Sequence, residues 1–365
     1  MRLALAGSAL FVLACLLVPQ GLRSTALYSD VHTYHAYAHN MTSGRVPYRD
    51  FFDEYPPLAQ PIILAARSVL LFKLLLTLCG IGIVWLLATV FRSGAAVAVF
   101  ALSPLLVGSI YLNAYDLWPA LLLAVALALF ARERPMWAFA VLGAATAAKI
   151  YPAAVLPIAL VFVPRACRVR GVLWFAGVFV LAHLPFLILG PGGLRFSYTV
   201  QAKRGLELNS LGSSILLVSG HRTLASQPPG SLNVVGGPAR TLAVVSTVLV
   251  LAAIALVTWL YARGRIPFLT ACAGAVVGFV AFDKVFSAQY VEWLAPLAPL
   301  GGVVAAAGTA VVLALTHVVF SHRTALSEQR DCWILLVRNL AVVALFGRLA
   351  LRRRGDANGS ARDRL

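Results

Sequence analysis

Residues 69–91 read VLLFKLLLTLCGIGIVWLLATVF and contain a single charged side chain, that of Lys73. An apolar run of about 20 residues is long enough to cross the hydrocarbon core of a bilayer as a helix. The rest of the chain has the same character, because 61% of its 365 residues are hydrophobic and only 12% are charged. Soluble domains contain about 45–50% apolar residues. The sequence therefore predicts a membrane protein and argues against a soluble enzyme or a disordered chain.

Further apolar runs lie on both sides of this segment. They cover roughly residues 3–19, 94–112, 117–131, 136–148, 152–164, 171–189, 241–261, 266–282, 290–301, 303–320 and 333–350. Together with residues 69–91 they predict an all-α polytopic membrane protein, a bundle of about 12 transmembrane helices within a range of about 10–13. Residues 3–19 suit either a secretory signal or a retained first helix, and their length favours the retained helix.

The polar segments set the expected domain organisation. We predict one transmembrane domain over residues 1–350, with outer loops at residues 20–66 and 190–240 that carry amphipathic helices, and a disordered cytoplasmic tail over residues 351–365. A cytoplasmic amino terminus places the Arg-rich loops inside, in agreement with the positive-inside rule. Ten of the 13 acidic residues then lie on or near the outer side. We therefore expect the active groups at the extracytoplasmic face of a plasma membrane.

The net charge of +17 does not indicate a nucleic-acid partner in a chain of this composition. In a membrane protein an excess of arginine marks cytoplasmic loops and lipid phosphates more often than nucleic acid. The sequence contains no P-loop and no dinucleotide fingerprint, so we expect no nucleotide cofactor. Its five widely spaced cysteines indicate neither a disulfide framework nor a zinc site.

The first outer loop begins with a predicted helix that carries the main catalytic candidate. Ser29 suits the N-cap, and Gly44 suits the position after the C-cap. Asp30 would lie in the first turn, where the helix dipole favours its ionised form. Such a carboxylate can accept a proton from a sugar hydroxyl, or it can simply complete the cap. The apolar stripe that would hold this helix on the membrane surface consists of Val31, Tyr34, Ala38 and Met41.

The same helix carries His32, His35 and His39 at spacings that place them on one face. With Asp30 they imitate a metal site, but we find no matching carboxylate pair elsewhere. A solvated polar face near lipid headgroups is the interpretation we favour. No metal ligand is therefore assigned, and the need for a divalent metal is left open.

Other charged and aromatic groups stand at the ends of predicted spans. Residues 45–57, RVPYRDFFDEYPP, suit a rigid interfacial loop, either as an anchor or as a site for sugar hydroxyls. Ionisable residues within or near the bilayer are functional candidates by default, although snorkelling to the interface lowers the free-energy cost of their charge. Two adjacent cations can bind phosphate oxygens or lipid headgroups. The residues concerned are Asp116, Lys149, Lys203, Arg204, Asp283 and Lys284.

The order of these motifs resembles that of the GT-C glycosyltransferases. It is similar to the bacterial polyprenyl-phosphate-mannose-dependent mannosyltransferases of phosphatidylinositol mannoside synthesis. The motifs are Asp30…Tyr34…Gly44-x-x-Pro47-Tyr48…Glu54-Tyr55-Pro56-Pro57, Asp116-Leu117-Trp118, Lys149-Ile150-Tyr151-Pro152, Arg204-Gly205-Leu206-Glu207…Ser210 and Lys284-Val285-Phe286-Ser287-x-Gln289-Tyr290…Trp293. Two departures concern donor detail and acceptor choice: Ala288 stands where the resemblance leads us to expect proline, and Asn209 where we expect an acid.

The resemblance implies a GT-C-like bundle and an inverting sugar transfer. The donor would be a polyprenyl-phosphate-linked sugar, with mannose implied, and the acceptor a glycolipid or glycan. Asp30 would be the general base, and no cofactor is required. The cations Lys203, Arg204 and Lys284 would stabilise the leaving phosphate. The residues expected to position the substrates are Glu54, Tyr55, Asp116, Lys149, Glu207, Gln289 and Tyr290.

Two other functions remain open from the residues alone. A lipid or lipid-linked-sugar flippase would also use many spans and intramembrane charges, although transporters typically show repeats and midplane sites. We find no convincing repeat, and the ionisable residues gather near one interface. A scaffold that only binds a lipid-linked sugar would keep the motifs without needing Asp30 as a base.

Overall fold

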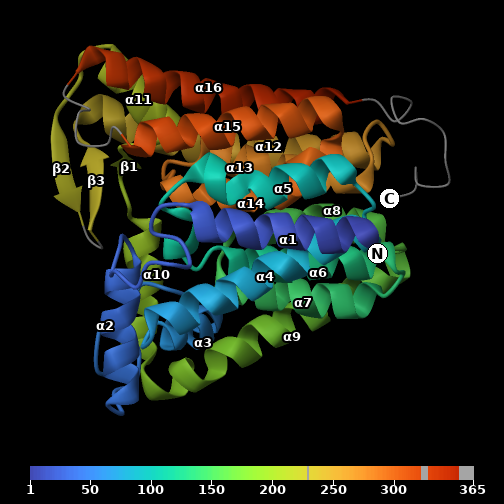
Figure 1. Cartoon of the computed structure of the whole chain (residues 1–365), viewed down its shortest axis with the longest axis horizontal. Coiled ribbons are helices and arrows are strands. Elements are labelled where there is room, and N and C mark those ends of the chain that lie inside the picture. The colour runs from blue at the N-terminus through green and yellow to red at the C-terminus, as the bar shows by residue number, and fades with distance from the viewer. Residues whose placement is uncertain (228–229, 322–327, 353–365) are drawn as a thin grey trace. The chain divides into compact units, whose positions relative to one another are not determined.

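The computed structural model describes residues 1–227, 230–321 and 328–352 (Figure 1). The chain divides into two compact units, unit 1 (Met1–Ala202) and unit 2 (Lys203–Leu365). The predicted single transmembrane domain over residues 1–350 stays a prediction. Of the predicted cytoplasmic tail, residues 353–365 lie outside the described part.

Unit 1 is built from helices. They are α1 (Arg2–Leu17), α2 (Val31–Thr42), α3 (Gln60–Ala65), α4 (Val69–Thr89), α5 (Gly94–Val107), α6 (Leu117–Ala131), α7 (Pro135–Ala148), α8 (Leu156–Phe162), α9 (Arg165–Leu189) and α10 (Pro191–Ala202), with 3-10 turns η1 (Pro57–Ala59), η2 (Tyr111–Asn113) and η3 (Tyr151–Val155). Helix α7 packs against α6 and α9, and α1 packs against α4 and α5. Figure 1 shows α2 running across one end of α1 and α4.

Unit 2 combines helices with a small antiparallel sheet. Its elements are β1 (Leu206–Glu207), α11 (Leu211–Val218), β2 (Leu224–Gln227), β3 (Ser231–Val234), α12 (Gly237–Ala262), α13 (Phe268–Phe282), η4 (Ala288–Tyr290), α14 (Val291–Leu297), η5 (Ala298–Gly301), α15 (Val303–Ser321) and α16 (Gln329–Leu351). The strands are ordered β1-β3-β2, with Leu206 paired to Val234. Figure 1 shows the sheet and α11 at one end of the long helices of this unit. The sequence did not predict these strands within residues 190–240.

Five of the described helices are long and apolar enough to cross a membrane, namely α4, α9, α12, α15 and α16. Six shorter apolar helical stretches, which include α6 and α7, accompany them. This content agrees with the predicted all-α membrane protein, whereas the predicted number of about 12 spans is not confirmed. Two expected runs are interrupted. Residues 94–112 stop as α5 at Val107, where Gly108 follows with φ +81°. Residues 290–301 are divided at Pro296 and Pro299.

The ends of α2 differ in part from the expected ones. Gly44 follows the C-cap Ser43 and has φ +81°, as predicted for a residue that terminates a helix. The predicted N-cap Ser29 is wrong, because Asp30 is the N-cap and Ser29 has φ +51°. The Val31, Tyr34 and Ala38 side chains are buried within unit 1, so this stripe packs against protein.

Lys73 anchors the segment that leads to α2. This residue of α4 is fully buried, and its ammonium donates to the carbonyl oxygens of Gln20 (2.8 Å), Gly21 (3.2 Å) and Ser24 (2.8 Å). An ammonium has three donors, so these three carbonyls match them. The charge inside the apolar run therefore fixes the chain shortly before Asp30.

Candidate active site

Asp30 is held at the start of α2 by more than the helix itself. Its side chain makes no capping hydrogen bond. One carboxylate oxygen accepts from the Tyr34 hydroxyl at 3.4 Å, and the other accepts from the Ser29 hydroxyl at 3.5 Å. The residue is partly exposed. The sequence left two roles open for Asp30, helix capping and proton acceptance. Its side chain forms no capping hydrogen bond, and its carboxylate is accessible to a reacting group.

Three aromatic rings pack around Tyr34, the residue whose hydroxyl donates to Asp30. The Tyr34 ring is fully buried and lies 5.3 Å from the Tyr55 ring, 5.5 Å from the Phe72 ring and 5.8 Å from the Tyr115 ring, measured between centroids. Burial raises the pKa of Tyr34 well above its usual value, and the neighbouring charge of Asp30 raises it further. Tyr34 therefore stays protonated and can act only as a donor toward the carboxylate.

A buried ion pair closes the far side of this cluster. Lys149 Nζ lies 2.5 Å from Asp116 Oδ1 and 4.6 Å from the centroid of the Tyr115 ring. The Asp116 side chain is fully buried, and that of Lys149 is 14% exposed. Asp116 is the N-cap of α6 and Lys149 the C-cap of α7. Each charge therefore sits at the helix end whose dipole stabilises it.

Several hydrogen bonds fix the conformation of the loop over residues 45–57. The buried carboxylate of Asp53 accepts from the Tyr55 backbone N–H at 2.9 Å, and the Tyr48 hydroxyl donates to the Tyr55 carbonyl. Glu54 Oε2 accepts from the Gln201 amide in α10 at 3.2 Å. These contacts hold the Tyr55 ring against Tyr34. Unit 1 thus brings the predicted residues Asp30, Glu54, Tyr55, Asp116 and Lys149 to one polar and aromatic site, which we call the Asp30 site.

The second set of predicted residues lies in unit 2, around Glu207. Glu207 is 4% exposed, and its carboxylate accepts from the Asn209 backbone N–H (3.0 Å), the Asn209 side-chain amide (2.7 Å) and the Phe286 backbone N–H (3.2 Å). Its own backbone N–H donates to the Lys284 carbonyl at 2.9 Å. Burial raises the pKa of Glu207, while Arg204 and these hydrogen bonds oppose the rise. Glu207 therefore ties the Arg204 segment to the Lys284 segment.

Charged side chains of both signs lie around Glu207. Burial raises the pKa of Asp283 to about 6, and the nearby Lys284 and Arg204 act against the rise. Burial lowers the pKa of Lys284, and the like charge of Arg204 adds to this effect while Asp283 opposes it. Two cations thus lie within electrostatic range of each other.

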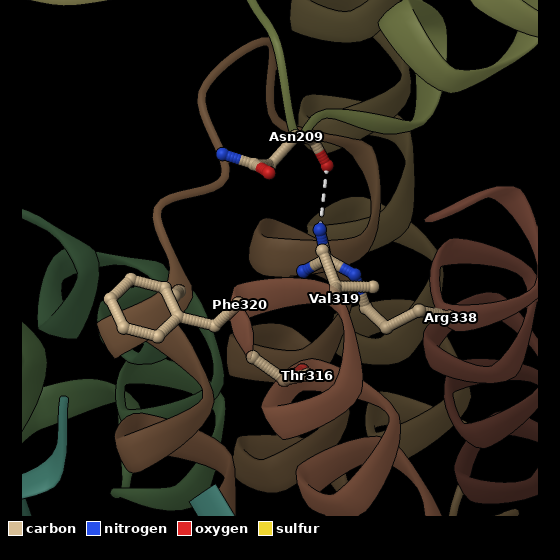
Figure 2. A pocket seen from close by; sticks show the side chains of 6 residues that line it. Asn209, Thr316, Val319, Phe320 and Arg338 are labelled. Carbon is tan, nitrogen blue, oxygen red and sulfur yellow. Dashed lines mark hydrogen bonds between the residues drawn. The ribbon is translucent and has the colours of Figure 1, made fainter. Parts of the chain in front are cut away.

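Arg338 is a central residue that the sequence did not single out. It lies in α16, is 1% exposed, and donates to the Asn209 carbonyl oxygen at 2.9 Å (Figure 2). Its guanidinium carbon lies 3.8 Å from the centroid of the Phe286 ring. Arg338 and Asn209 line a cavity of about 10 Å³, which is the size of one water and too small for a phosphate. Arg338 therefore joins the two polypeptide segments that Glu207 also joins.

The other predicted residues of unit 2 lie less centrally. Lys203 is exposed and directly precedes Arg204 in the chain. The Tyr290 ring stacks on Trp293 with centroids 4.0 Å apart, and Gln289 is partly buried beside it in η4. The predicted base therefore belongs to unit 1, and the predicted phosphate ligands belong to unit 2.

The histidine face of α2 does not form a metal site in the described part of the chain. No group of three or more His, Cys, Asp or Glu side chains there could hold a metal ion. His35 instead contacts the Ala66 carbonyl oxygen through Nδ1 at 2.9 Å.

Loss of the Lys149 ammonium should destabilise unit 1 strongly, because Asp116 would remain buried without its counter-ion. We expect Lys149→Met to lower the free energy of unfolding by about 3–5 kcal/mol. The double variant Asp116→Asn/Lys149→Met should regain much of that loss, since it buries no unpaired charge. Unfolding of the purified variants in detergent micelles, followed by tryptophan fluorescence, measures both effects. Equal stability of the single and the double variant would contradict an electrostatic pairing.

Asp53 should make stability depend on pH. Burial raises its pKa to about 7, so the folded chain keeps a proton that the unfolded chain releases above about pH 4. The free energy of unfolding should therefore fall between about pH 4 and 7, by up to about 1.4 kcal/mol per pH unit, and level off above pH 7. This contribution should disappear in Asp53→Asn. Thermal unfolding of both proteins across this range tests the expectation, which parallel pH curves would refute.

Comparison with known proteins identifies the family. No curated protein matches the chain. A family model described as Glycosyltransferase family 87 matches residues 54–282, which is more than half of the chain. The matched range includes Asp116, Lys149, Arg204 and Glu207, whereas Asp30 and Arg338 lie outside it. The predicted residues of unit 1 and those of unit 2 thus both include members of the matched range. Because the model covers more than half of the chain, the chain belongs to glycosyltransferase family 87.

Proposed function

We propose that this membrane glycosyltransferase transfers mannose from a polyprenyl-phosphate donor to a glycolipid or glycan acceptor, with inversion at the anomeric carbon. Membership of family 87 supports glycosyl transfer. The lipid-linked donor, the sugar, the acceptor and a reaction at the extracytoplasmic face of the plasma membrane are our extension. They rest on the resemblance of the motifs and on the predicted topology.

The observation that carries this proposal is the environment of Asp30. Its carboxylate is partly exposed and makes no capping hydrogen bond. It accepts from the hydroxyl of Tyr34, whose ring packs against three other rings. A general base needs such a defined position and access to the proton it removes. Asp116 is less suited to this role, because its side chain is fully buried and paired with Lys149.

The proposed reaction is a single displacement. The acceptor oxygen forms a bond to the anomeric carbon while the bond between that carbon and the donor phosphate oxygen breaks. Asp30 takes the proton of the acceptor hydroxyl, and the phosphate leaves with the bonding electron pair. Fixed positions for the acceptor and donor lower the entropic barrier. Charge that develops on the phosphate is stabilised by cations, and the candidates are Lys203, Arg204 and Lys284.

A flippase remains the alternative of another class, and family membership does not favour it. The two functions differ in one measurable product. A transferase forms a new glycosidic bond, whereas a flippase moves the lipid-linked sugar unchanged.

Asp30→Asn should abolish transfer while leaving the fold intact, because the amide has the shape of the carboxylate and cannot accept the proton. We expect the rate of label transfer from radiolabelled polyprenyl-phosphate-mannose to a lipid acceptor extract to fall by about a hundredfold or more. Asp50→Asn is the matched control. Asp50 belongs to the same loop, and its exposed ion pair with Arg49 contributes little to stability. Equal transfer by wild type and Asp30→Asn would remove Asp30 from the mechanism.

Lys284→Met should slow transfer through loss of charge stabilisation. We expect kcat to fall by about a hundredfold, with a smaller change in KM, if the ammonium acts mainly on the leaving phosphate. Lys203→Met should have the smaller effect of the two, since Lys203 is exposed. Steady-state kinetics with the same donor, on variants of unchanged melting temperature, distinguishes these outcomes. A Lys284→Met enzyme with wild-type kcat would exclude this role.

A further inference from the structure

An open hollow of about 490 Å³ lies beside α2. Its volume is in the range of sites for small molecules, about 300–1,000 Å³. The hollow is lined by His35, His39, Thr42, Arg67 and Ser68. All five side chains are polar, and three of them can carry a positive charge. No carboxylate is among these described lining residues, so the lining suits an anion.

The three basic side chains of the hollow are available to a ligand. Arg67 and His39 are exposed, and within the described residues neither side chain has a hydrogen bond or an ion pair. His35 is oriented, because its Nδ1 lies 2.9 Å from the Ala66 carbonyl oxygen. A carbonyl only accepts, so Nδ1 carries the proton, and Nε2 donates to an anion when the ring is doubly protonated. The guanidinium adds a planar fork that matches phosphate oxygens.

The position of the hollow along α4 indicates where such a ligand resides. Arg67 and Ser68 directly precede Val69, the first residue of a helix long and apolar enough to cross a membrane. Residues just before such a helix lie at the level of the lipid headgroups. Ser68 is also the N-cap of α4 and accepts from the Leu71 backbone N–H at 3.4 Å, so this corner is fixed. An anion site at this level would be within reach of lipid phosphates.

We propose that this hollow binds the phosphate group of an anionic membrane lipid. The Arg67 guanidinium contacts the phosphate oxygens, and the imidazoles of His35 and His39, one helical turn apart, face it from α2. None of the residues that line the hollow belongs to the Asp30 site. The proposal does not depend on the reaction proposed above.

Native mass spectrometry of the purified full-length protein in detergent tests this site. The probe is phosphatidylglycerol, and a galactosyl diacylglycerol that has no phosphate serves as the comparison lipid. We expect Arg67→Gln and His39→Gln to weaken phosphatidylglycerol binding by about tenfold, the usual weight of a hydrogen bond to a charged group. Binding of the galactolipid should not change. Both residues are exposed, so the melting temperatures of the variants should equal that of the wild type.

Arg195→Gln is the matched control, because Arg195 is an exposed arginine of the same unit outside the hollow. Unchanged phosphatidylglycerol binding in Arg195→Gln supports the site. An equal loss in Arg195→Gln and Arg67→Gln would reduce the effect to general attraction between charges and overturn the proposal. Inorganic phosphate distinguishes the source of the anion. If it raises the melting temperature of the wild type but not of Arg67→Gln, while lipid binding is the same in both, the ligand is a soluble phosphate and the lipid assignment is wrong.

Discussion

The Asp30 site depends on the buried ion pair between Asp116 and Lys149. This pair joins the start of α6 to the end of α7 and places the Tyr115 ring beside the ammonium. Tyr115 in turn packs edge-on against Tyr34 and Tyr55. A pair of opposite charges tolerates burial only with close geometry, here 2.5 Å between Nζ and Oδ1. The ends of α6 and α7 therefore help to position the rings that pack around the partner of the catalytic candidate.

In each unit a buried side chain donates a hydrogen bond to a residue of the predicted site. In unit 1 a tyrosine kept protonated by burial donates to Asp30, and in unit 2 a buried guanidinium, Arg338, donates to the Asn209 carbonyl oxygen. The donor is fully buried in both cases, and in unit 1 its partner Asp30 is the more accessible of the two. Rigid support of this kind keeps reacting groups oriented without solvent reorganisation.

Much of the helical framework could be predicted from apolar runs, since α4, α6 and α7 have nearly the expected bounds. Gly44 marked the end of α2 because a left-handed residue there favours glycine. The assembly of Asp30, Tyr55 and Lys149 at one site followed from family resemblance, because contacts between distant segments leave no local pattern. Arg338 escaped notice although a charge within an apolar run is itself a signal. The short strands lacked any alternating pattern long enough to detect.

The anchoring of Lys73 has a consequence for how the protein enters the bilayer during synthesis. An ammonium that enters hydrocarbon without partners is expensive. The three carbonyl groups that it needs belong to residues 20–24, which leave the ribosome before α4 does. The segment that follows α1 is thus already synthesised when the lysine is made. Burial of this lysine in α4 therefore requires that segment to be in place to accept the three N–H groups of the ammonium.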